Sequence, residues 1–259
     1  MCVLVTRPRA QAGKLRDRLV GLGAEVTVQA AIEIAPPHDW ARVDDALSRL
    51  SEFDWLVFSS TNGVSFLFER LDLLNRTENR GAEPRQACEL VPAGLKLAAI
   101  GPGTAEELKK FQLHADFVPQ EFRAEALAEG LARNARGKRF LLARASRGRQ
   151  VLCERLSDAG AMVEEVVVYE SRDISAKNLA IIKVTGDLAA GRIDWVTVTS
   201  SAIARSIARL YGDNLRQAKL ASISPITSGV LRELGYQPAV EASEYSMEGV
   251  ARAILRFEE

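Results

Sequence analysis

Val3-Leu-Val-Thr-Arg7, close to the N-terminus, has a counterpart much later in the chain, Phe140-Leu-Leu-Ala-Arg144. Each segment is followed by a helical pattern that ends at a Gly-Ala pair, Gly23-Ala24 or Gly160-Ala161, and then by a second apolar run. Glycine directly after a periodic apolar stretch is typical of a helix C-terminus. Self-similarity on this scale predicts two copies of one α/β unit, with a crevice between them as the natural ligand site.

Two further segments are repeated in the same order. Asp54-Trp-Leu-Val-Phe-Ser-Ser60 is matched by Asp194-Trp-Val-Thr-Val-Thr-Ser200, and Lys96-Leu-Ala-Ala-Ile-Gly-Pro-Gly-Thr104 by Lys219-Leu-Ala-Ser-Ile-Ser-Pro-Ile-Thr227. Short apolar runs that alternate with amphipathic stretches are typical of βαβ units and parallel sheets. The runs predicted as strands are Cys2–Thr6, Val26–Ile34, Trp55–Ser59, Lys96–Ile100, Ala115–Val118, Arg139–Ala143, Val163–Tyr169, Trp195–Thr199, Lys219–Ile223 and Pro238–Ala242.

The order of the copies allows two domain plans, and periodicity alone does not choose between them. In the tandem plan the domains are residues 1–135 and 136–259. In the crossed plan, the long apolar runs that end near Ile34 and Ser171 continue as paired strands joining the domains. The segments of the crossed plan are 1–34 with 175–259 as a discontinuous domain, 37–170 as an inserted domain, and linkers near 34–37 and 170–175.

Composition excludes several classes of protein. The chain has 259 residues, of which 47% are hydrophobic and 26% charged, enough for two ordinary cores. Lys+Arg and Asp+Glu both number 34, so no net field attracts nucleic acid or an anionic membrane. No secretory leader is visible, no apolar run approaches the roughly 20 residues that span a bilayer, and the three scattered cysteines indicate free thiols. We expect a cytoplasmic protein.

Several kinds of catalytic site lack their sequence patterns. The two histidines, His38 and His114, have no partners at metal-ligand or catalytic-triad spacing. There is no P-loop and no G-x-G-x-x-G, and Gly101-Pro-Gly103 carries a proline where a dinucleotide loop needs bare backbone. We therefore expect neither a metal nor a cofactor. The insertion Asn75–Pro92, which has no counterpart in the second copy, is predicted to be a surface loop.

Hydroxyls and arginines gather at the ends of the predicted strands. In an open α/β sheet, ligands bind beyond the carboxyl ends of the strands, and the helix that starts there favours anions. Serine and threonine at these places are also ordinary helix caps, although Asp, an equally good cap, is absent from all these turns. The arginines fit a solvated basic edge or a rim that gathers carboxylates equally well. The candidate binding residues are Arg7, Ser59, Ser60, Asn62, Gly101, Thr104, Arg144, Thr199, Ser200, Ser201, Ser224 and Thr227.

Tyr169 ends the apolar run that begins at Val163. A tyrosine at the end of a strand is commonly a packing residue. In the crossed plan, however, this run leads out of one domain toward the other, so that the phenol could face the crevice.

The sequence resembles the uroporphyrinogen-III synthase family over essentially its whole length. Each matching motif is short, and their order, spacing and crossed duplication carry the resemblance. The motifs are Val3-Leu-Val-Thr-Arg-Pro8, Trp55-Leu-Val-Phe-Ser-Ser-Thr-Asn-Gly-Val64, Ala99-Ile-Gly-Pro-Gly-Thr-Ala105, Val168-Tyr169, Thr199-Ser-Ser201, Ser222-Ile-Ser-Pro-Ile-Thr227 and Tyr245-Ser-Met-Glu-Gly-Val250.

The resemblance implies the crossed plan, with two HemD-like, flavodoxin-like parallel-sheet domains joined by a two-stranded linker. It implies a cofactor-independent hydro-lyase of porphyrin, tetrapyrrole and haem biosynthesis. Such an enzyme cyclises hydroxymethylbilane, with inversion of ring D, to uroporphyrinogen III and water. Tyr169 is carried over as the candidate catalytic acid, and Thr104 and Thr227 as cleft hydroxyls. Hydroxymethylbilane synthase is then the expected upstream donor, and we expect a monomer.

Two rival functions share some of these features. A non-catalytic two-lobed sensor that binds a small anion would explain the duplication and the polar crevice equally well. A nucleotide-sugar enzyme would need acidic residues at the strand ends for a metal or a ribose, and the sequence lacks them there.

Overall fold

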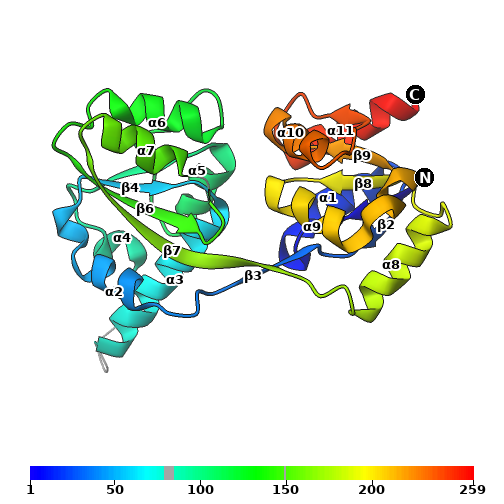
Figure 1. Ribbon diagram of the computed structural model, residues 1–259. Coiled ribbons are helices and arrows are strands. Elements are labelled where there is room, and N and C mark those ends of the chain that lie inside the picture. The colour runs from blue at the N-terminus through cyan, green and yellow to red at the C-terminus, as the bar shows by residue number, and fades with distance from the viewer. Residues whose placement is uncertain (79–84, 149) are drawn as a thin grey trace. The chain divides into compact units, whose positions relative to one another are not determined.

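The computed structural model describes residues 1–78, 85–148 and 150–259, and the chain divides into two compact units. Unit 1 contains Met1–Ile34 and Ser171–Glu259, and unit 2 contains Ala35–Glu170. The N-terminal segment therefore shares its core with the C-terminal part of the chain, as the blue and the yellow-to-red ribbons of Figure 1 show. Within the described ranges, no helix is both long and apolar enough to cross a membrane.

The sheet of unit 1 is parallel, with strand order β10-β9-β8-β1-β2. Read from β2, this order is that of a flavodoxin-like sheet, as expected. Alternating residues of β1 point to opposite faces, so Val3 and Val5 enter one apolar core and Leu4 the other. The strands are β1 (Cys2–Val5), β2 (Glu25–Val28), β8 (Trp195–Val198), β9 (Lys219–Ser222) and β10 (Val240–Glu241).

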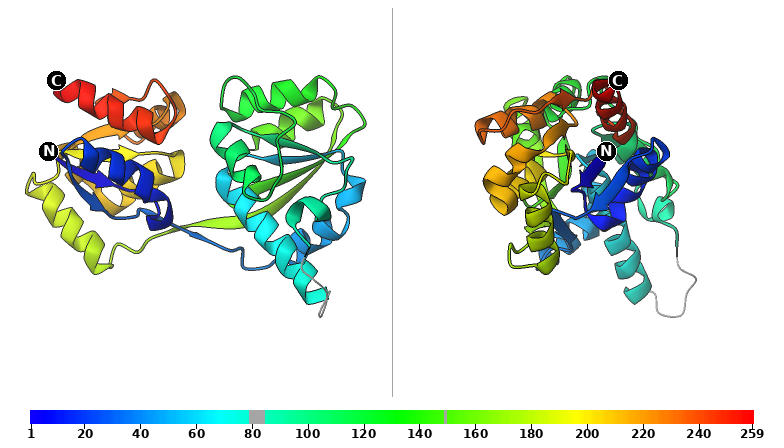
Figure 2. Two further views of the ribbon diagram at one scale, coloured as in Figure 1. Left: turned by 180° about the vertical axis from the view of Figure 1, so that it is seen from behind. Right: turned by 90° about the vertical axis from the view of Figure 1, so that its right-hand side faces the viewer.

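Helices cover both faces of this sheet. Helices α1 and α11, blue and red in Figure 2, pack on the face that carries Val3, and α8, α9 and α10 pack on the face that carries Leu4. A parallel sheet buried on both faces explains why the strands read as continuous apolar runs. The helices are α1 (Arg9–Gly21), α8 (Leu179–Ala189), α9 (Ser201–Tyr211), η2 (Gly212–Gln217), α10 (Pro225–Glu233) and α11 (Met247–Glu258).

Unit 2 repeats this architecture, with strand order β3-β7-β6-β4-β5. When β6 is taken as the counterpart of β1, the strands β7, β6, β4 and β5 correspond to β2, β1, β8 and β9 of unit 1. At the position of β10, unit 2 has only a bridge between Ala98 and Phe117. The strands are β3 (Ile32–Ala35), β4 (Trp55–Phe58), β5 (Lys96–Ala99), β6 (Arg139–Ala145) and β7 (Met162–Asp173), and the helices are α2 (Ala41–Ser48), η1 (Leu50–Glu52), α3 (Thr61–Glu78), α4 (Ala87–Leu90), α5 (Pro102–Lys109), α6 (Ala124–Ala132) and α7 (Val151–Asp158).

The predicted strand Val26–Ile34 is wrong, because the run is divided between two strands in different sheets. The backbone N–H groups of Gln29 and Ala31 still donate to the carbonyls of Val5 and Thr6 at the end of β1, and the chain then joins β7 as β3. Both β3 and β7 cross a unit boundary and are neighbours in the sheet, which makes them the expected two-stranded linker.

The predictions of strand and loop at three other places also needed correction. Ala115–Val118 makes a single bridge rather than a strand, and the predicted strand Pro238–Ala242 is shortened to Val240–Glu241. The segment Asn75–Pro92 is not simply a loop: α3 continues to Glu78, and α4 follows at Ala87. Asn75 extends the buried stripe of α3 and is only 6% exposed, while residues 79–84 of this prediction lie outside the described residues.

The predicted helix ends at Gly23, Gly160 and Gly235 are confirmed. These glycines have φ of 82°, 83° and 83°, in the left-handed region that ends a helix and that residues with a Cβ rarely adopt. The same stop signal closes α1 and α7 at matching places in the two copies, and it also closes α10.

Candidate functional site

The carboxyl edge of the unit 2 sheet, where its strands end, brings Tyr169 to the turn between β4 and α3. The Tyr169 hydroxyl donates a hydrogen bond to Ser60 Oγ at 3.1 Å, across a sequence separation of 109 residues. Ser60 Oγ also accepts the N–H of Gly63 at 3.0 Å, which makes it the cap of α3. In the sheet, β7 and β4 are separated by the single strand β6. The sheet order therefore brings Tyr169, at the end of β7, to the turn after β4, although the two residues are far apart in sequence.

Tyr169 occupies an apolar, mostly closed environment. Its side chain is 8% exposed, and its ring stacks on Phe66 with centroids 5.8 Å apart and planes 22° apart. Burial raises the pKa of the Tyr169 phenol, and its hydrogen bonds with Ser60 and Asn62 offset only part of that rise. The phenol is therefore neutral at physiological pH, and it can act as a proton donor rather than as a base.

The next turn of the same edge, between β5 and α5, holds Gly101 and Thr104. Gly101 precedes α5, and a Cβ placed on it would come within 3.1 Å of the Phe122 side chain. A larger residue at this position would require the Phe122 side chain, which is 45% exposed, to shift by a few tenths of an ångström. Thr104 is buried, and its N–H donates to the Gly101 carbonyl at 3.1 Å. The turn carries no hydrogen bond to Tyr169 among the described residues.

The carboxyl edge of unit 1 shows the same capping chemistry. Ser200 Oγ accepts the N–H of Ile203 at 3.2 Å, and Ser224 Oγ accepts the N–H of Thr227 at 3.4 Å. The hydroxyl of buried Thr227 lies 3.2 Å from that of Ser224. The serines of these turns are thus helix caps in both units. Ser59 and Ser201, directly beside them, are partly exposed.

Arg7 lies two residues after the end of β1 and Arg144 is the penultimate residue of β6, and the two have different partners. Arg7 donates to Thr199 Oγ1 at 3.3 Å, which joins two of the predicted residues. Arg144 forms an ion pair with Glu165 at 2.6 Å. Phe66 and Glu165 were not among the predicted site residues. Glu165 had a detectable signal, because Glu164 and Glu165 are the two charged residues inside the predicted strand Val163–Tyr169.

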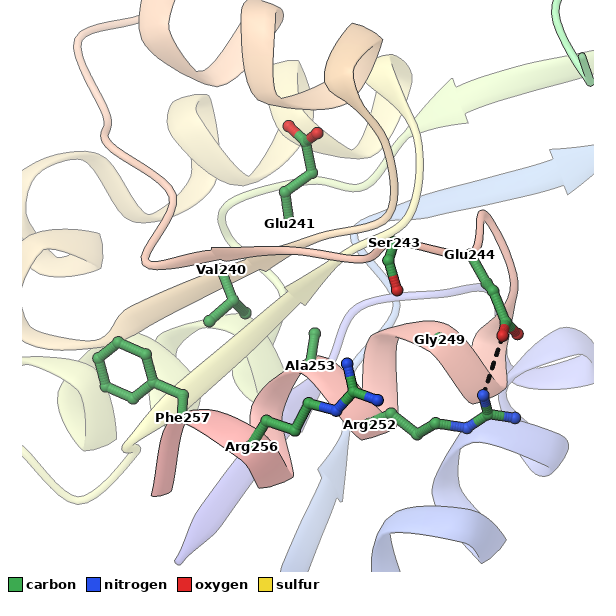
Figure 3. Close-up of a pocket in the computed structure, with 9 residues that line it drawn as sticks. All are labelled: Val240, Glu241, Ser243, Glu244, Gly249, Arg252, Ala253, Arg256 and Phe257. Carbon is green, nitrogen blue, oxygen red and sulfur yellow. Dashed lines mark hydrogen bonds and ion pairs between the residues drawn. The ribbon is translucent and has the colours of Figure 1, made fainter. Parts of the chain in front are cut away.

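A separate hollow in unit 1 lies between β10 and α11, and none of the predicted residues lines it. Figure 3 shows Arg252 and Arg256 extending from α11, with Arg252 paired to Glu244 at 2.9 Å. Across the ranges that the structure describes, no group of His, Cys, Asp and Glu side chains is arranged to hold a metal ion.

Fold and site together define a duplicated flavodoxin-like α/β protein with capped, hydroxyl-bearing turns at the carboxyl edge of each sheet. The sequence model described as uroporphyrinogen-III synthase HemD matches residues 13–252. A uroporphyrinogen-III synthase from Synechococcus elongatus is 32% identical over 265 residues, which cover 98% of this chain and 94% of that relative.

Solved structures show the same fold. A mutant uroporphyrinogen III synthase from Thermus thermophilus matches with a TM-score of 0.67 at 15% identity, covering all of both chains. The uroporphyrinogen-III synthetase from Helicobacter pylori 26695 matches with a TM-score of 0.63 at 18% identity, covering 99% of this chain and 98% of that one. The chain belongs to the HemD family of uroporphyrinogen-III synthases, enzymes of tetrapyrrole biosynthesis. The comparisons give no support to the alternative of a non-catalytic anion sensor.

Proposed function

We propose that this chain cyclises hydroxymethylbilane to uroporphyrinogen III and water, with inversion of ring D. The observation that carries the proposal is the family match over residues 13–252, which spans both units. The capped turns and the buried phenol supply a chemical rationale for it. Hydroxymethylbilane carries eight carboxylates, and helix N-termini with free N–H groups favour anions.

Both carboxyl edges take part in substrate binding in this proposal. The hydroxyl, amide and backbone groups of the turns accept or donate hydrogen bonds to the acetate and propionate side chains of the substrate. Thr104 and Thr227 have a packing role as well, because both are buried. The residues assigned to substrate binding are Ser59, Ser60, Asn62, Gly101, Thr104, Thr199, Ser200, Ser201, Ser224 and Thr227.

The reaction begins with loss of the hydroxyl of the ring A hydroxymethyl group. Its C–O bond breaks, the electron pair leaves with oxygen, and the departing oxygen takes a proton from the Tyr169 phenol to become water. The pyrrole nitrogen supplies electrons, which gives an electrophilic azafulvene. Ring D attacks through its substituted carbon, forms a spiro intermediate, breaks and rejoins inverted, and the final proton lost from carbon returns to Tyr169.

Tyr169 suits the role of acid because its environment keeps it protonated. The raised pKa of the phenol, caused mainly by burial, means that it holds its proton throughout the neutral range. General acid catalysis by a positioned side chain contributes on the order of a hundredfold. Transfer to the substrate requires the proton now donated to Ser60 to turn toward the leaving oxygen, so substrate binding competes with the Ser60 hydrogen bond.

Positioning supplies the rest of the catalysis. The linear tetrapyrrole also closes spontaneously, without inversion, so the enzyme must chiefly hold the geometry in which ring D attacks through its substituted carbon. Fixing two reacting groups in place contributes several kcal/mol, on the order of 7 or more in favourable cases. The reaction exchanges a C–O bond for a C–C bond and releases water without net oxidation. A hydro-lyase that needs no cofactor is therefore proposed.

The proposal extends to the setting of the enzyme. It acts as a monomer in the cytoplasm and receives its unstable substrate from hydroxymethylbilane synthase. The test is to supply freshly made hydroxymethylbilane to the purified chain and to separate the uroporphyrin isomers after oxidation. Enrichment of the type III isomer over a protein-free control is the expected result. A product mixture identical to that of the control would disprove the proposed activity.

A further inference from the structure

The two arginines at the carboxyl edges occupy equivalent places in the two sheets. In unit 1, Val5 of β1 pairs with Val28 of β2, and Arg7 follows two residues later. In unit 2, Leu142 of β6 pairs with Glu165 of β7, and Arg144 follows two residues later. Strand register therefore makes Val28 and Glu165 equivalent positions, one apolar and one acidic.

Arg144 has an acidic counter-ion inside its own unit, although its Nε is buried without a partner. Its Nη1 lies 2.6 Å from Glu165 Oε1 and 3.0 Å from Gln150 Oε1, and its Nη2 donates to the Gly148 carbonyl. The side chains of Arg144 and Glu165 are only 11% and 24% exposed. A partly buried pair of this kind neutralises the guanidinium charge and leaves little of it for a ligand.

Arg7 has no such counter-ion among the described residues. Its two hydrogen bonds go to neutral oxygens, Thr199 Oγ1 at 3.3 Å and Gln11 Oε1 at 3.1 Å. Nε is buried without a partner, as it is in Arg144, but here no carboxylate of the described residues lies within ion-pair distance of the guanidinium. Of the five N–H donors that a guanidinium carries, three are thus left without an acceptor from the described residues.

An unpaired guanidinium in this position is energetically costly. Burial lowers the pKa of Arg7, the direction expected when a charge is desolvated without compensation. Arginine stays protonated at neutral pH even so, and its planar fork matches a carboxylate in a bidentate arrangement. A bound carboxylate would supply the charge that Glu165 supplies to Arg144, and it would relieve this cost.

We propose that Arg7 binds a carboxylate of the substrate, and that Arg144 instead stabilises unit 2. The duplicated arginines have thus separated into a binding residue and a structural one, through the single difference between Val28 and Glu165. The identity of the ligand as a tetrapyrrole carboxylate rests on the proposed function. The unpaired charge itself does not, because it follows from the contacts within unit 1.

The test compares Arg7→Met with Arg144→Met, and uses Arg192→Met as the matched control. Arg192 lies in unit 1, is 63% exposed and pairs with Asp187, so its removal leaves the site unchanged. KM and kcat are measured with hydroxymethylbilane, and Tm is measured for each variant. Binding of uroporphyrin III, which keeps the eight carboxylates, is measured separately at several salt concentrations.

For Arg7→Met we expect KM and the Kd for uroporphyrin III to rise about ten- to a hundredfold, the effect of losing one charge-assisted hydrogen-bonded pair. Its kcat changes less than about threefold, and the salt dependence of binding becomes shallower. Arg144→Met lowers Tm by several degrees, because Glu165 loses its partner, and changes KM little. Arg7→Lys, which keeps the charge without the fork, falls between Arg7→Met and the wild type.

Val28→Glu is a second test that leaves Arg7 in place. It reproduces in unit 1 the acid that neutralises Arg144, so we expect it to weaken uroporphyrin III binding about as much as Arg7→Met does. An unchanged Kd in both Arg7→Met and Val28→Glu would overturn the inference. So would an Arg144→Met variant with unchanged Tm and an equally raised KM. If the wild type produced no excess of type III isomer, the proposed function would fail, and the uroporphyrin III measurements would still decide the role of Arg7.

Discussion

Unit 1 and unit 2 share one sheet order, a glycine that ends α1 and α7, and a serine that caps α9 and α3, yet their carboxyl edges differ at single positions. Unit 2 carries Tyr169, which is hydrogen-bonded to Ser60. The equivalent residue of the first copy, at the same sequence separation that relates Arg7 to Arg144, is Ile32, which is buried in the core of unit 1. Duplication thus preserved the packing of the sheets, while individual residues at their edges became different. The acid of the proposed reaction belongs to unit 2 alone.

The largest expected effect is that of Tyr169→Phe, which removes the phenol that has no counterpart in unit 1. We expect kcat to fall more than tenfold, since general acid catalysis contributes on the order of a hundredfold. The fold should persist, because the ring keeps its contact with Phe66. Steady-state kinetics with hydroxymethylbilane, together with Tm, provide the measurement. A wild-type kcat in this variant would transfer the acid role to water or to the substrate itself.

The pH profile is a second test of the same residue. An acid is active while protonated, and burial raises the pKa of Tyr169 above its ordinary value of about 10. The contribution of Tyr169 to kcat is therefore complete below that value and is lost only as the pH rises through the raised pKa. We expect kcat of the wild type to show no loss from this group between roughly pH 7 and 9. A descending limb near neutral pH that disappears in Tyr169→Phe would contradict the assigned environment.

Ser60→Ala should have a smaller effect, which combines stability and activity. The α3 cap is lost, at a cost of about 1 kcal/mol, and Tyr169 loses a positioning partner, so we expect kcat to fall several-fold. Ser246→Ala is the matched control, because Ser246 Oγ caps α11 through the Gly249 N–H at 3.0 Å and touches no proposed site residue. Chemical denaturation and kcat are compared for the two. Equal stability losses with an unchanged kcat in both would remove Ser60 from the site.

Replacement of Thr104 and Thr227 together by valine tests whether equivalent turns of the two units act on one substrate. We expect the proportion of uninverted isomer to rise about two- to fivefold, the effect of roughly 0.5–1 kcal/mol in the competition between the two closures. Both single variants should show smaller increases. Chromatographic separation of the isomers is the measurement, and an unchanged ratio in the double variant would exclude both hydroxyls from substrate positioning.

Tyr211→Phe is expected to have the smallest effect and serves as a control in unit 1 for Tyr169→Phe. Tyr211 is buried, and its hydroxyl has no hydrogen-bond partner among the described residues. Its removal should raise the free energy of unfolding by up to about 1 kcal/mol, since a buried unsatisfied group is eliminated. Denaturant titration measures this, and kcat should not change. A clear loss of stability would mean that the hydroxyl is satisfied in solution.

Much of the fold could be predicted from the sequence, because its signals are local. Glycines stopped helices at Gly23, Gly160 and Gly235, and buried parallel strands appeared as apolar runs. The predictions were wrong where an apolar run does not indicate which strand it pairs with. The run from Val26 to Ile34 gave no sign of the change of sheet, and the polar residues after Asn75 hid the continuation of α3 to Glu78.

The candidate site was predictable in part. The hydroxyls of the turns could be named, since strand ends and helix starts are visible as patterns, and several of them are caps, such as Ser60 and Ser200. The hydrogen-bond partners of these hydroxyls could not be predicted. Whether Ser60 meets Tyr169 depends on β6 lying between their strands, and that order is a property of the assembled sheet.

The repeated amino-acid pattern was sufficient to establish the α/β class, the duplication and the chemistry available at the strand ends, because each depends on neighbours along the chain. The side-chain partners of these residues were decided only by the folded sheet. Arg7 and Arg144 look alike in the sequence, and only the register of β2 and β7 reveals that the position of Glu165, the partner of Arg144, is occupied by Val28 in unit 1. A charge is neutralised by what lies within a few ångströms of it, and those neighbours are brought there by strands distant in sequence.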